Sequence, residues 1–317
     1  MDNLTHTLTG LMLCRAGLNR FYSRPGLVLM IAANAPDIDV TWSFRGTIGY
    51  IEHHRAITHS IAFMPVLAFL PVLIACLALR STRGWKAAWA LSVIGIASHL
   101  LLDWTNAYGI RLLLPFSARW LQLDLNNIFD FWIWGVLLLA AFGPMLAKLV
   151  SSEIGAAAGS GRGLAIFALC FLPVYDFGRY LSHQRAIQML NSRVYQNAVP
   201  LRTAAFPESA ANPFEWSGWV DTADASEHFL LNVLSPFDPS SGTVIYKPDP
   251  SDALQAARRS RMVQEFLKFA RYPLWRVTPI ADPEGARRVD LTDWRFPFTV
   301  TSIVDASNRV LSSSFHF

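Results

Sequence analysis

Four apolar runs in the first 178 residues constrain the fold of this chain more than any other feature. They are Ile61–Leu79, Ala87–Leu102, Ile128–Leu146 and Gly163–Phe177. Because a helix rises about 1.5 Å per residue, the longest of these runs match the thickness of a bilayer core. Tryptophans flank the second and third runs, as is typical of a membrane interface. The sequence therefore predicts a multi-pass membrane domain with about four transmembrane helices.

The apolar character ends near residue 178. Beyond it, residues 252–271 have the pattern of an amphipathic helix. Segments rich in strand-forming residues alternate there with turn residues, namely Phe214–Val220, Thr243–Tyr246, Arg287–Leu291 and Phe296–Val304. We therefore expect two domains: a mainly α membrane domain over residues 1–178, and a smaller soluble α+β domain over residues 179–317.

Charge and cysteine content exclude several other classes of protein. The net charge of +4 is modest, and the basic residues form no long stripe with interleaved aromatics, so nucleic-acid binding is not expected. Cys14, Cys76 and Cys170 lie in apolar stretches, which predicts buried thiols without a disulfide or thiolate metal site. The N-terminus lacks the features of a cleaved signal peptide. The small-residue stretch 155–163 is typical of a linker.

Side chains of the metal-ligand type gather at the boundaries of the apolar segments. Residues 53–60 place His54, Arg55, Thr58, His59 and Ser60 directly before the first run. The other candidates are His6 in a predicted helix over residues 2–18, Asp37 and Asp39 after Pro36, and His99 and Asp103 at the end of the second run. With four spans, strict alternation puts all of these side chains on one side of the membrane.

Each group taken alone also has an ordinary structural explanation. A Pro-Asp turn commonly ends a helix, and a histidine and a carboxylate four residues apart are neighbours that can simply share a hydrogen bond. Two carboxylates near membrane depth are less common, because unpaired charge there is costly. A purely structural hydrogen-bonded cluster therefore stays open beside a functional site.

Imidazole and carboxylate groups are the ligands expected for zinc or another divalent metal in a hydrolytic site. Such a site activates water toward a phosphoryl or acyl centre, and phosphoester cleavage is the most natural reaction class. Arg55 is expected to stabilise the developing negative charge, and Asp39 to take part in catalysis. Thr58 and Ser60 are expected to orient ligands, since no Ser-His-Asp arrangement follows from the spacing.

Taken together, these motifs resemble a known family. The set Thr5-His6…Gly10, Pro36-Asp37-Ile38-Asp39, His54-Arg55-x-x-Thr58-His59-Ser60 and His99-x-x-x-Asp103 is similar to the membrane-bound metal-dependent hydrolases, also described as LexA-binding, inner-membrane-associated hydrolases. That family is in turn similar to the zinc-dependent phospholipase C and single-strand nuclease superfamily. The resemblance covers about residues 1–178 and implies a phospholipase C-like helical core. It also implies metal ligands at His6, Asp37, His54 or His59, His99 and Asp103.

This chain departs from the phospholipase pattern in one respect: it has no second His-x-x-x-Glu helix, which puts a three-metal cluster in doubt. The resemblance does not extend to residues 179–317, whose role stays open. The resemblance transfers a reaction class better than a substrate, and the LexA part of the family name says nothing about DNA binding by this chain.

Two functions follow as expectations. The first is an integral membrane metal-dependent hydrolase that cleaves a phosphoester in a lipid or lipid-linked substrate at the bilayer surface. The alternative is a non-catalytic membrane metal-binding, transport or scaffold protein whose soluble domain binds a partner. The substrate and oligomeric state do not follow from the sequence.

The family resemblance implies a location in a bacterial-type inner membrane, and the charge bias predicts the orientation there. Arg80, Arg83 and Lys86 crowd one short loop, and Lys148 and Arg162 flank another. Basic residues in short loops favour the cytoplasm. The candidate site and residues 179–317 are therefore expected on the periplasmic or outer side.

Overall fold

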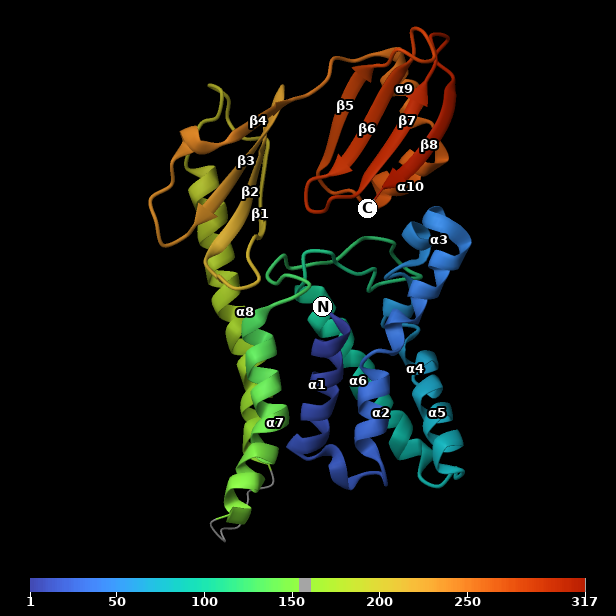
Figure 1. Ribbon diagram of the computed structural model, residues 1–317, viewed down its shortest axis with the longest axis vertical. Helices are drawn as coiled ribbons and strands as arrows, with labels where there is room; N and C mark the ends of the chain where they lie inside the picture. The colour runs from blue at the N-terminus through green and yellow to red at the C-terminus, as the bar shows by residue number, and fades with distance from the viewer. Residues whose placement is uncertain (154–160, 317) are drawn as a thin grey trace.

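The structure, a computed structural model, describes residues 1–153 and 161–316. Helices form one end of the molecule and two β-sheets form the other (Figure 1). The helical part contains the α-helices α1 (Asn3–Ala16), α2 (Pro25–Ala32), α3 (Gly46–His53), α4 (Met64–Leu67), α5 (Phe69–Leu79), α6 (Trp85–Thr105), α7 (Phe131–Glu153) and α8 (Arg162–Asn191). It also contains the 3-10 helices η1 (Leu18–Arg20), η2 (Ala35–Arg45) and η3 (Ile57–His59).

Three helices, α6, α7 and α8, are long and apolar enough to cross a membrane. They correspond to the last three of the predicted spans. The expected count of four is not confirmed, because the run Ile61–Leu79 begins as a turn and is then divided into α4 and α5. Pro65 and Pro71 both lie in the first turn of a helix, where a missing N–H costs least, so the run starts a new helix near each proline.

The hairpin of α1 and α2 lies among these longer helices (Figure 1). Asp2 caps α1, as its side chain accepts hydrogen bonds from the backbone N–H groups of Leu4 and Thr5. Gly10 of α1 faces α2 so closely that a Cβ there would lie 2.7 Å from the carbonyl oxygen of Leu29. Glycines allow this approach because they have no side chain. Helix α2 is therefore held at backbone-contact distance, which fixes where η2 begins.

The C-terminal part contains two four-stranded antiparallel sheets, each with its strands in sequence order. The first sheet contains β1 (Arg202–Pro207), β2 (Glu215–Asp221), β3 (Ala225–Asn232) and β4 (Thr243–Tyr246), with the 3-10 helix η4 (Pro239–Ser241) between the last two. The second contains β5 (Pro273–Pro279), β6 (Arg287–Asp293), β7 (Thr299–Val304) and β8 (Val310–His316), and α9 (Asp252–Arg258) and α10 (Arg261–Phe269) pack on it.

The four predicted strands correspond to β2, β4, β6 and β7, whereas β1, β3, β5 and β8 were not predicted. The single helix expected over residues 252–271 is two helices, because Ser260 caps a new start by accepting a hydrogen bond from the N–H of Val263. Helix α8 runs unbroken past the expected boundary at residue 178 and packs on β1 and β2. Most of the expected linker at 155–163 falls outside the described residues.

The connection between α6 and α7 lies between the helices and the second sheet (Figure 1). Arg271 binds Asp124 of this connection through an ion pair of 2.9 Å, and Arg261 binds Glu52 of α3 at 2.8 Å. The second sheet is therefore tied to the end of the helical bundle where the candidate residues lie.

Candidate metal centre

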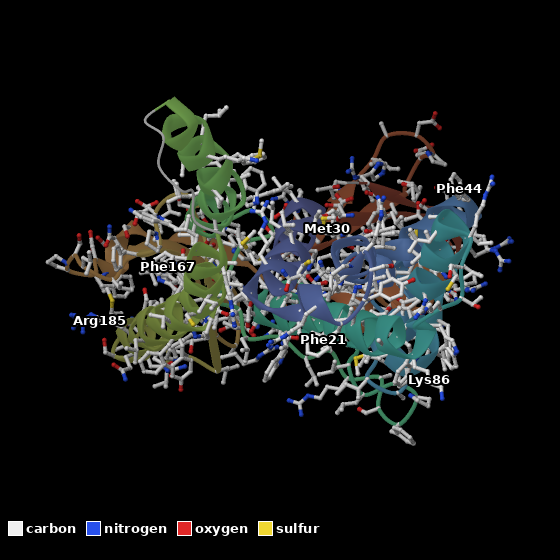
Figure 2. All side chains as sticks on the ribbon, turned by 90° about the horizontal axis from the view of Figure 1, so that it is seen from below. Phe21, Met30, Phe44, Lys86, Phe167 and Arg185 are labelled. Carbon is white, nitrogen blue, oxygen red and sulfur yellow. The ribbon has the colours of Figure 1, made fainter. Side chains whose placement is uncertain are left out.

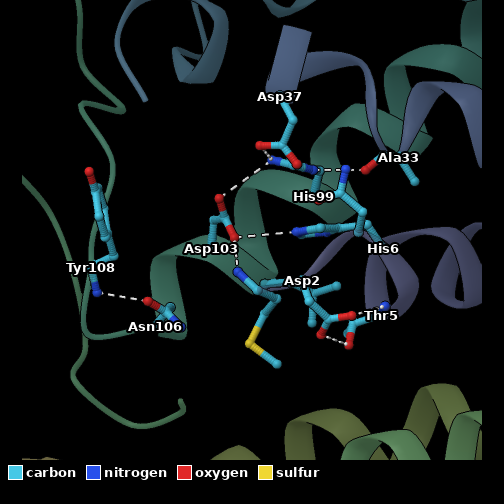
Figure 3. Close-up of polar contacts among 12 residues, drawn as sticks. Asp2, Thr5, His6, Ala33, Asp37, His99, Asp103, Asn106 and Tyr108 are labelled. Carbon is cyan, nitrogen blue, oxygen red and sulfur yellow. Dashed lines mark hydrogen bonds and ion pairs between the residues drawn. The ribbon is translucent and has the colours of Figure 1, made fainter. Parts of the chain in front are cut away.

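Four helical segments bring the predicted ligands together at this end of the bundle. His6 comes from the first turns of α1, Asp37 and Asp39 from η2, and His59 from η3. His99 and Asp103 lie one turn apart on the inward face of α6. Figure 3 shows His6, Asp37, His99 and Asp103 pointing toward one another.

Four of these side chains could hold a metal ion: Asp37, His59, His99 and Asp103, whose ligand atoms all lie within 4.8 Å of one another. The Nε2 atoms of His59 and His99 are 3.2 Å apart. Each lies 3.4–3.7 Å from an oxygen of Asp37 and of Asp103. Around a tetrahedral ion with bonds of about 2.0–2.1 Å, neighbouring ligand atoms lie about 3.3–3.4 Å apart. The residues present therefore fit a small divalent cation.

Hydrogen bonds fix the orientation of both imidazoles. The Nδ1 of His99 lies 2.7 Å from the carbonyl oxygen of Ala33, an acceptor that requires this nitrogen to carry the proton. The Nδ1 of His59 lies 3.1 Å from a carboxylate oxygen of Asp39. Both contacts leave the Nε2 lone pair directed toward the cluster, as in metal sites whose ligating histidines are held by carboxylates or carbonyls.

Asp39 lies behind His59 and outside the group of four. It accepts hydrogen bonds from the backbone N–H of Arg55 and the hydroxyl of Thr58, both at 2.8 Å, and it contacts Nδ1 of His54 at 2.9 Å. Burial opposes its ionisation, yet the hydrogen bonds from His54 and His59 lower its pKa well below the usual value. The expectation was a catalytic Asp39, and the contacts of this residue are those of a group that orients its neighbours.

His54 also lies outside the group of four. Of the two candidate histidines in this segment, His59 is therefore the one whose ring nitrogen lies close to the other candidate ligands. The His54 ring stacks on Tyr50 with 4.5 Å between centroids, and its Nδ1 is used by Asp39. Burial lowers the pKa of His54, which makes the neutral imidazole the dominant form at neutral pH.

The two carboxylate oxygens of Asp103 face different neighbours. Oδ2 lies toward His59 and His99, and Oδ1 lies 3.3 Å from Nε2 of His6 and also contacts the amino group of Met1. The His6 ring stacks on His99 at 3.8 Å, and neither of its nitrogens makes a hydrogen bond. His6 is therefore beside the cluster, with buried donor and acceptor capacity that the protein itself does not satisfy.

His59 carries the clearest electrostatic signal outside the spans. Burial disfavours its charged form, but hydrogen bonds to Asp103, Asp37 and Asp39 outweigh burial and raise its pKa to about 10. Without a bound cation, His59 is thus protonated at neutral pH. The negative charges of Asp37, Asp39 and Asp103 favour the protonated, positively charged form of the imidazole.

Arg55 borders the cluster. Its Nη2 lies 3.2 Å from Oδ2 of Asp103, the side chain is almost fully buried, and its Nε has no hydrogen-bond partner. The backbone of Arg55 has a φ of +52°, a conformation that costs a non-glycine residue free energy. The hydrogen bond from its N–H to Asp39 helps to hold this conformation.

The second sheet covers Arg55 through Tyr108, a residue of the α6–α7 connection that the sequence did not single out. The guanidinium of Arg55 lies 4.7 Å from the Tyr108 ring centroid. Phe269 and Phe296 pack on the same ring at 4.9 and 5.2 Å, and Arg295 donates a hydrogen bond to the carbonyl of Ala107. Nothing in the spacing of the sequence points to these contacts, because they join segments far apart in the chain, up to 188 residues for Ala107 and Arg295.

The fold and the cluster define a multi-span membrane protein with a buried His/Asp site of metal-binding geometry. The sequence model of the YdjM inner membrane protein family matches residues 1–186, and the chain belongs to that family. It is 25% identical to the uncharacterized protein YfhP of Bacillus subtilis (strain 168) over 84% of this chain and 76% of YfhP. It is 32% identical to the uncharacterized protein YvsG of the same organism over 38% of this chain and 76% of YvsG.

No solved structure matches the chain. The phospholipase C-like core implied by the sequence motifs is therefore not confirmed, and zinc as the metal is likewise an expectation. Membership of an inner membrane protein family, together with three candidate spans, supports a location in the membrane.

Proposed function

We propose that this protein is an integral membrane metal-dependent hydrolase that cleaves a phosphoester. The observation that carries the proposal is the buried guanidinium of Arg55. Its Nη2 lies 3.2 Å from Oδ2 of Asp103, and its Nε has no hydrogen-bond partner among the described residues. A guanidinium in this position suits an anionic group such as a phosphate, which arginine binds with paired hydrogen bonds.

Asp37, His59, His99 and Asp103 would hold the ion, most naturally zinc given two imidazole and two carboxylate donors. His6 borders this set, with its Nε2 3.3 Å from Oδ1 of Asp103. When bound there, a divalent ion would supply Lewis-acid chemistry, polarising a phosphoryl oxygen and acidifying water.

The residues of the chain supply the remaining parts of the reaction. Asp39 and the Ala33 carbonyl hold the two imidazoles in their orientation, and Arg55 binds the negative charge that grows on the phosphoryl oxygens. Water adds its oxygen to phosphorus, the ester P–O bond breaks, and one proton of that water ends on the leaving alcohol. Tyr108 and the aromatic residues of the second sheet exclude bulk water from Arg55.

A second candidate function is metal carriage or sensing without catalysis. It is favoured by the number of ligands, because four protein donors fill a tetrahedral ion, and closed sites of this kind are structural. A catalytic site keeps a position for water or substrate. The exposure of Asp37, whose side chain is 17% accessible while those of His59, His99 and Asp103 are fully buried, marks where that position would open.

The test is metal analysis of the detergent-purified protein, paired with a screen of phosphomonoesters and phosphodiesters. His99→Ala should lower both bound metal and turnover, whereas Arg55→Ala should retain metal and lose turnover. His53→Ala is the matched control, since this histidine stacks on Trp42 away from the cluster and should change neither. Metal bound at full occupancy with no hydrolysis of any ester would favour the carrier. Unchanged metal content in His99→Ala would reject the ligand assignment.

A further inference from the structure

A largely apolar groove leads away from the metal cluster along α2. Its volume is about 610 Å³, and its walls come from α1, α2, η2 and α5. The apolar lining includes Leu27, Met30, Ile31 and Leu70. Figure 2 views the helices from the end away from the sheets and labels Met30 on α2. These side chains are only partly buried, so the groove is open on the outside of the bundle.

The polar residues of the groove gather at the end nearest the cluster. They are Asn3, Thr7, Asn34 and Asp37. The amide of Asn34 donates hydrogen bonds to the hydroxyl of Thr7 at 2.9 Å and to the carbonyl of Met30 at 2.8 Å, which fixes this end. From Leu27 to the end of α2 at Ala32 the helix covers about 8 Å at about 1.5 Å per residue, and Asn34 follows two residues later. The groove is thus amphipathic along its length, polar at the cluster and apolar away from it.

Asp37 belongs to both the groove and the cluster. It is one of the four candidate ligands and the one whose side chain keeps some exposure. An approach to the cluster past Asp37 therefore passes along the groove wall. Because the groove runs beside helices of membrane-spanning length, a molecule in it has its apolar part at bilayer depth and its polar part at the cluster.

We propose that this groove binds the alkyl chain of a membrane-resident phosphoester and delivers its phosphate to the cluster sideways from the bilayer. The proposal rests on the proposed hydrolase function and names the substrate class: a lipid-like phosphoester with at least one apolar chain. Free phosphate or a soluble phosphomonoester would use the cluster alone. The dependence of binding on the length of the alkyl chain therefore distinguishes a lipid-like phosphoester from free phosphate or a soluble phosphomonoester.

The probe is a series of n-alkylphosphonates, which bind like phosphoesters but are not hydrolysed. Binding to the metal-loaded protein is measured at fixed detergent concentration by calorimetry. Burial of one methylene contributes about 0.8 kcal/mol, so each added methylene should tighten binding about fourfold until the groove is full. Partition into empty micelles keeps rising with every added methylene. A dependence that did not level off once the chain was longer than the groove would therefore overturn the proposal.

Met30→Trp fills the groove without touching a candidate ligand, and it should abolish the chain-length dependence while leaving binding of inorganic phosphate unchanged. Leu27→Trp is a second variant in case the first does not fold. Leu139→Trp is the matched control, since this α7 side chain is 60% exposed and lies outside the groove. If the tryptophan at position 139 had the same effect as the one at position 30, the groove would be rejected.

Hydrolysis of p-nitrophenyl phosphate, which has no alkyl chain, separates the two proposals. Chain-length-dependent binding that Met30→Trp removes, without any metal-dependent hydrolysis, would support the groove and reject the enzyme. Metal-dependent hydrolysis without such binding would support the enzyme and reject the groove.

Discussion

Asp39 shows how one carboxylate can organise several residues of this site. It contacts His54 and His59 and accepts hydrogen bonds from the backbone of Arg55 and the side chain of Thr58. Both His59, a candidate ligand, and Arg55 therefore contact the same carboxylate. Asp39 orients these two residues and does not itself need to contact a substrate.

Asp39→Asn should weaken metal binding without deleting a ligand. The amide keeps the size of the side chain but loses the charge that holds the His59 imidazole. Loss of a comparable partner typically costs about 10- to 100-fold in metal affinity. Competition with a chromophoric chelator measures the affinity. Asp37→Asn, which removes a candidate ligand, should cost more, and equal affinities for wild type and Asp39→Asn would show that the orientation of His59 is fixed by other contacts.

Metal binding should release a proton from His59. Its pKa in the metal-free protein is raised from 6.5 to about 10, so its protonation stabilises that form fully below pH 6.5, and the contribution is lost as the pH rises through 10. An ion must displace this proton, and its apparent affinity should rise about tenfold per pH unit in this window. Calorimetry in buffers of different ionisation enthalpy measures the release. No proton release at neutral pH would contradict the protonation state of His59.

At the scale of elements, helix α2 sets the position of the cluster because it leads directly into η2. Two glycines from different helices pack against it. A Cβ on Gly10 of α1 would lie 2.7 Å from the carbonyl oxygen of Leu29, and a Cβ on Gly95 of α6 would lie 2.7 Å from the Cβ of Ala32. Such close approach supplies van der Waals contact where the lipid offers no hydrophobic driving force.

Gly10→Ala should destabilise the helical bundle by about 1–3 kcal/mol, since the new methyl group meets rigid backbone and not a movable side chain. The shift of α2 should also displace Asp37 and weaken metal binding. Gly135→Ala is the matched control, because no atom lies within 4 Å of the Cβ position on this α7 glycine. Thermal unfolding in detergent compares the two. Equal unfolding temperatures would mean that α2 can move away without cost.

At the scale of the whole molecule, the second sheet and the α6–α7 connection lie over the end of the bundle that contains the cluster (Figure 1). Arg295 has a fully buried side chain, pairs with Asp293 at 2.9 Å and donates to the carbonyl of Ala107. The sheet, the connection and Arg55 are therefore packed as one unit, on whichever side of the membrane that unit lies.

The two basic loops predict the orientation of that unit. Alkaline phosphatase fused after residue 317 should be active and a fusion at Gly84 inactive, because Arg80, Arg83 and Lys86 favour the cytoplasm. Green fluorescent protein at the same two positions gives the complementary readout. The opposite pattern would place the site in the cytoplasm and redirect the search for substrates toward internal lipids and nucleotides.

Features that depend on neighbours along the chain can be predicted from the amino-acid sequence. Three apolar runs were long enough to predict α6, α7 and α8, and the four-residue spacing of His99 and Asp103 placed both on one helix face, because helix geometry is local. The remaining predicted span, Ile61–Leu79, is not confirmed as a single helix, since new helices start near Pro65 and Pro71.

Which of the candidate residues meet depends on how the helices pack in three dimensions. His54 and His59 have equivalent chemistry, and the choice between them depends on the turn at Arg55 and on Asp39, which directs one ring toward the cluster and holds the other away. The contact of Tyr108 with Arg55 and with the second sheet joins distant segments. Such contacts come from the packing of whole elements, whose positions are set by close approaches such as that of Gly10, and no local pattern encodes them.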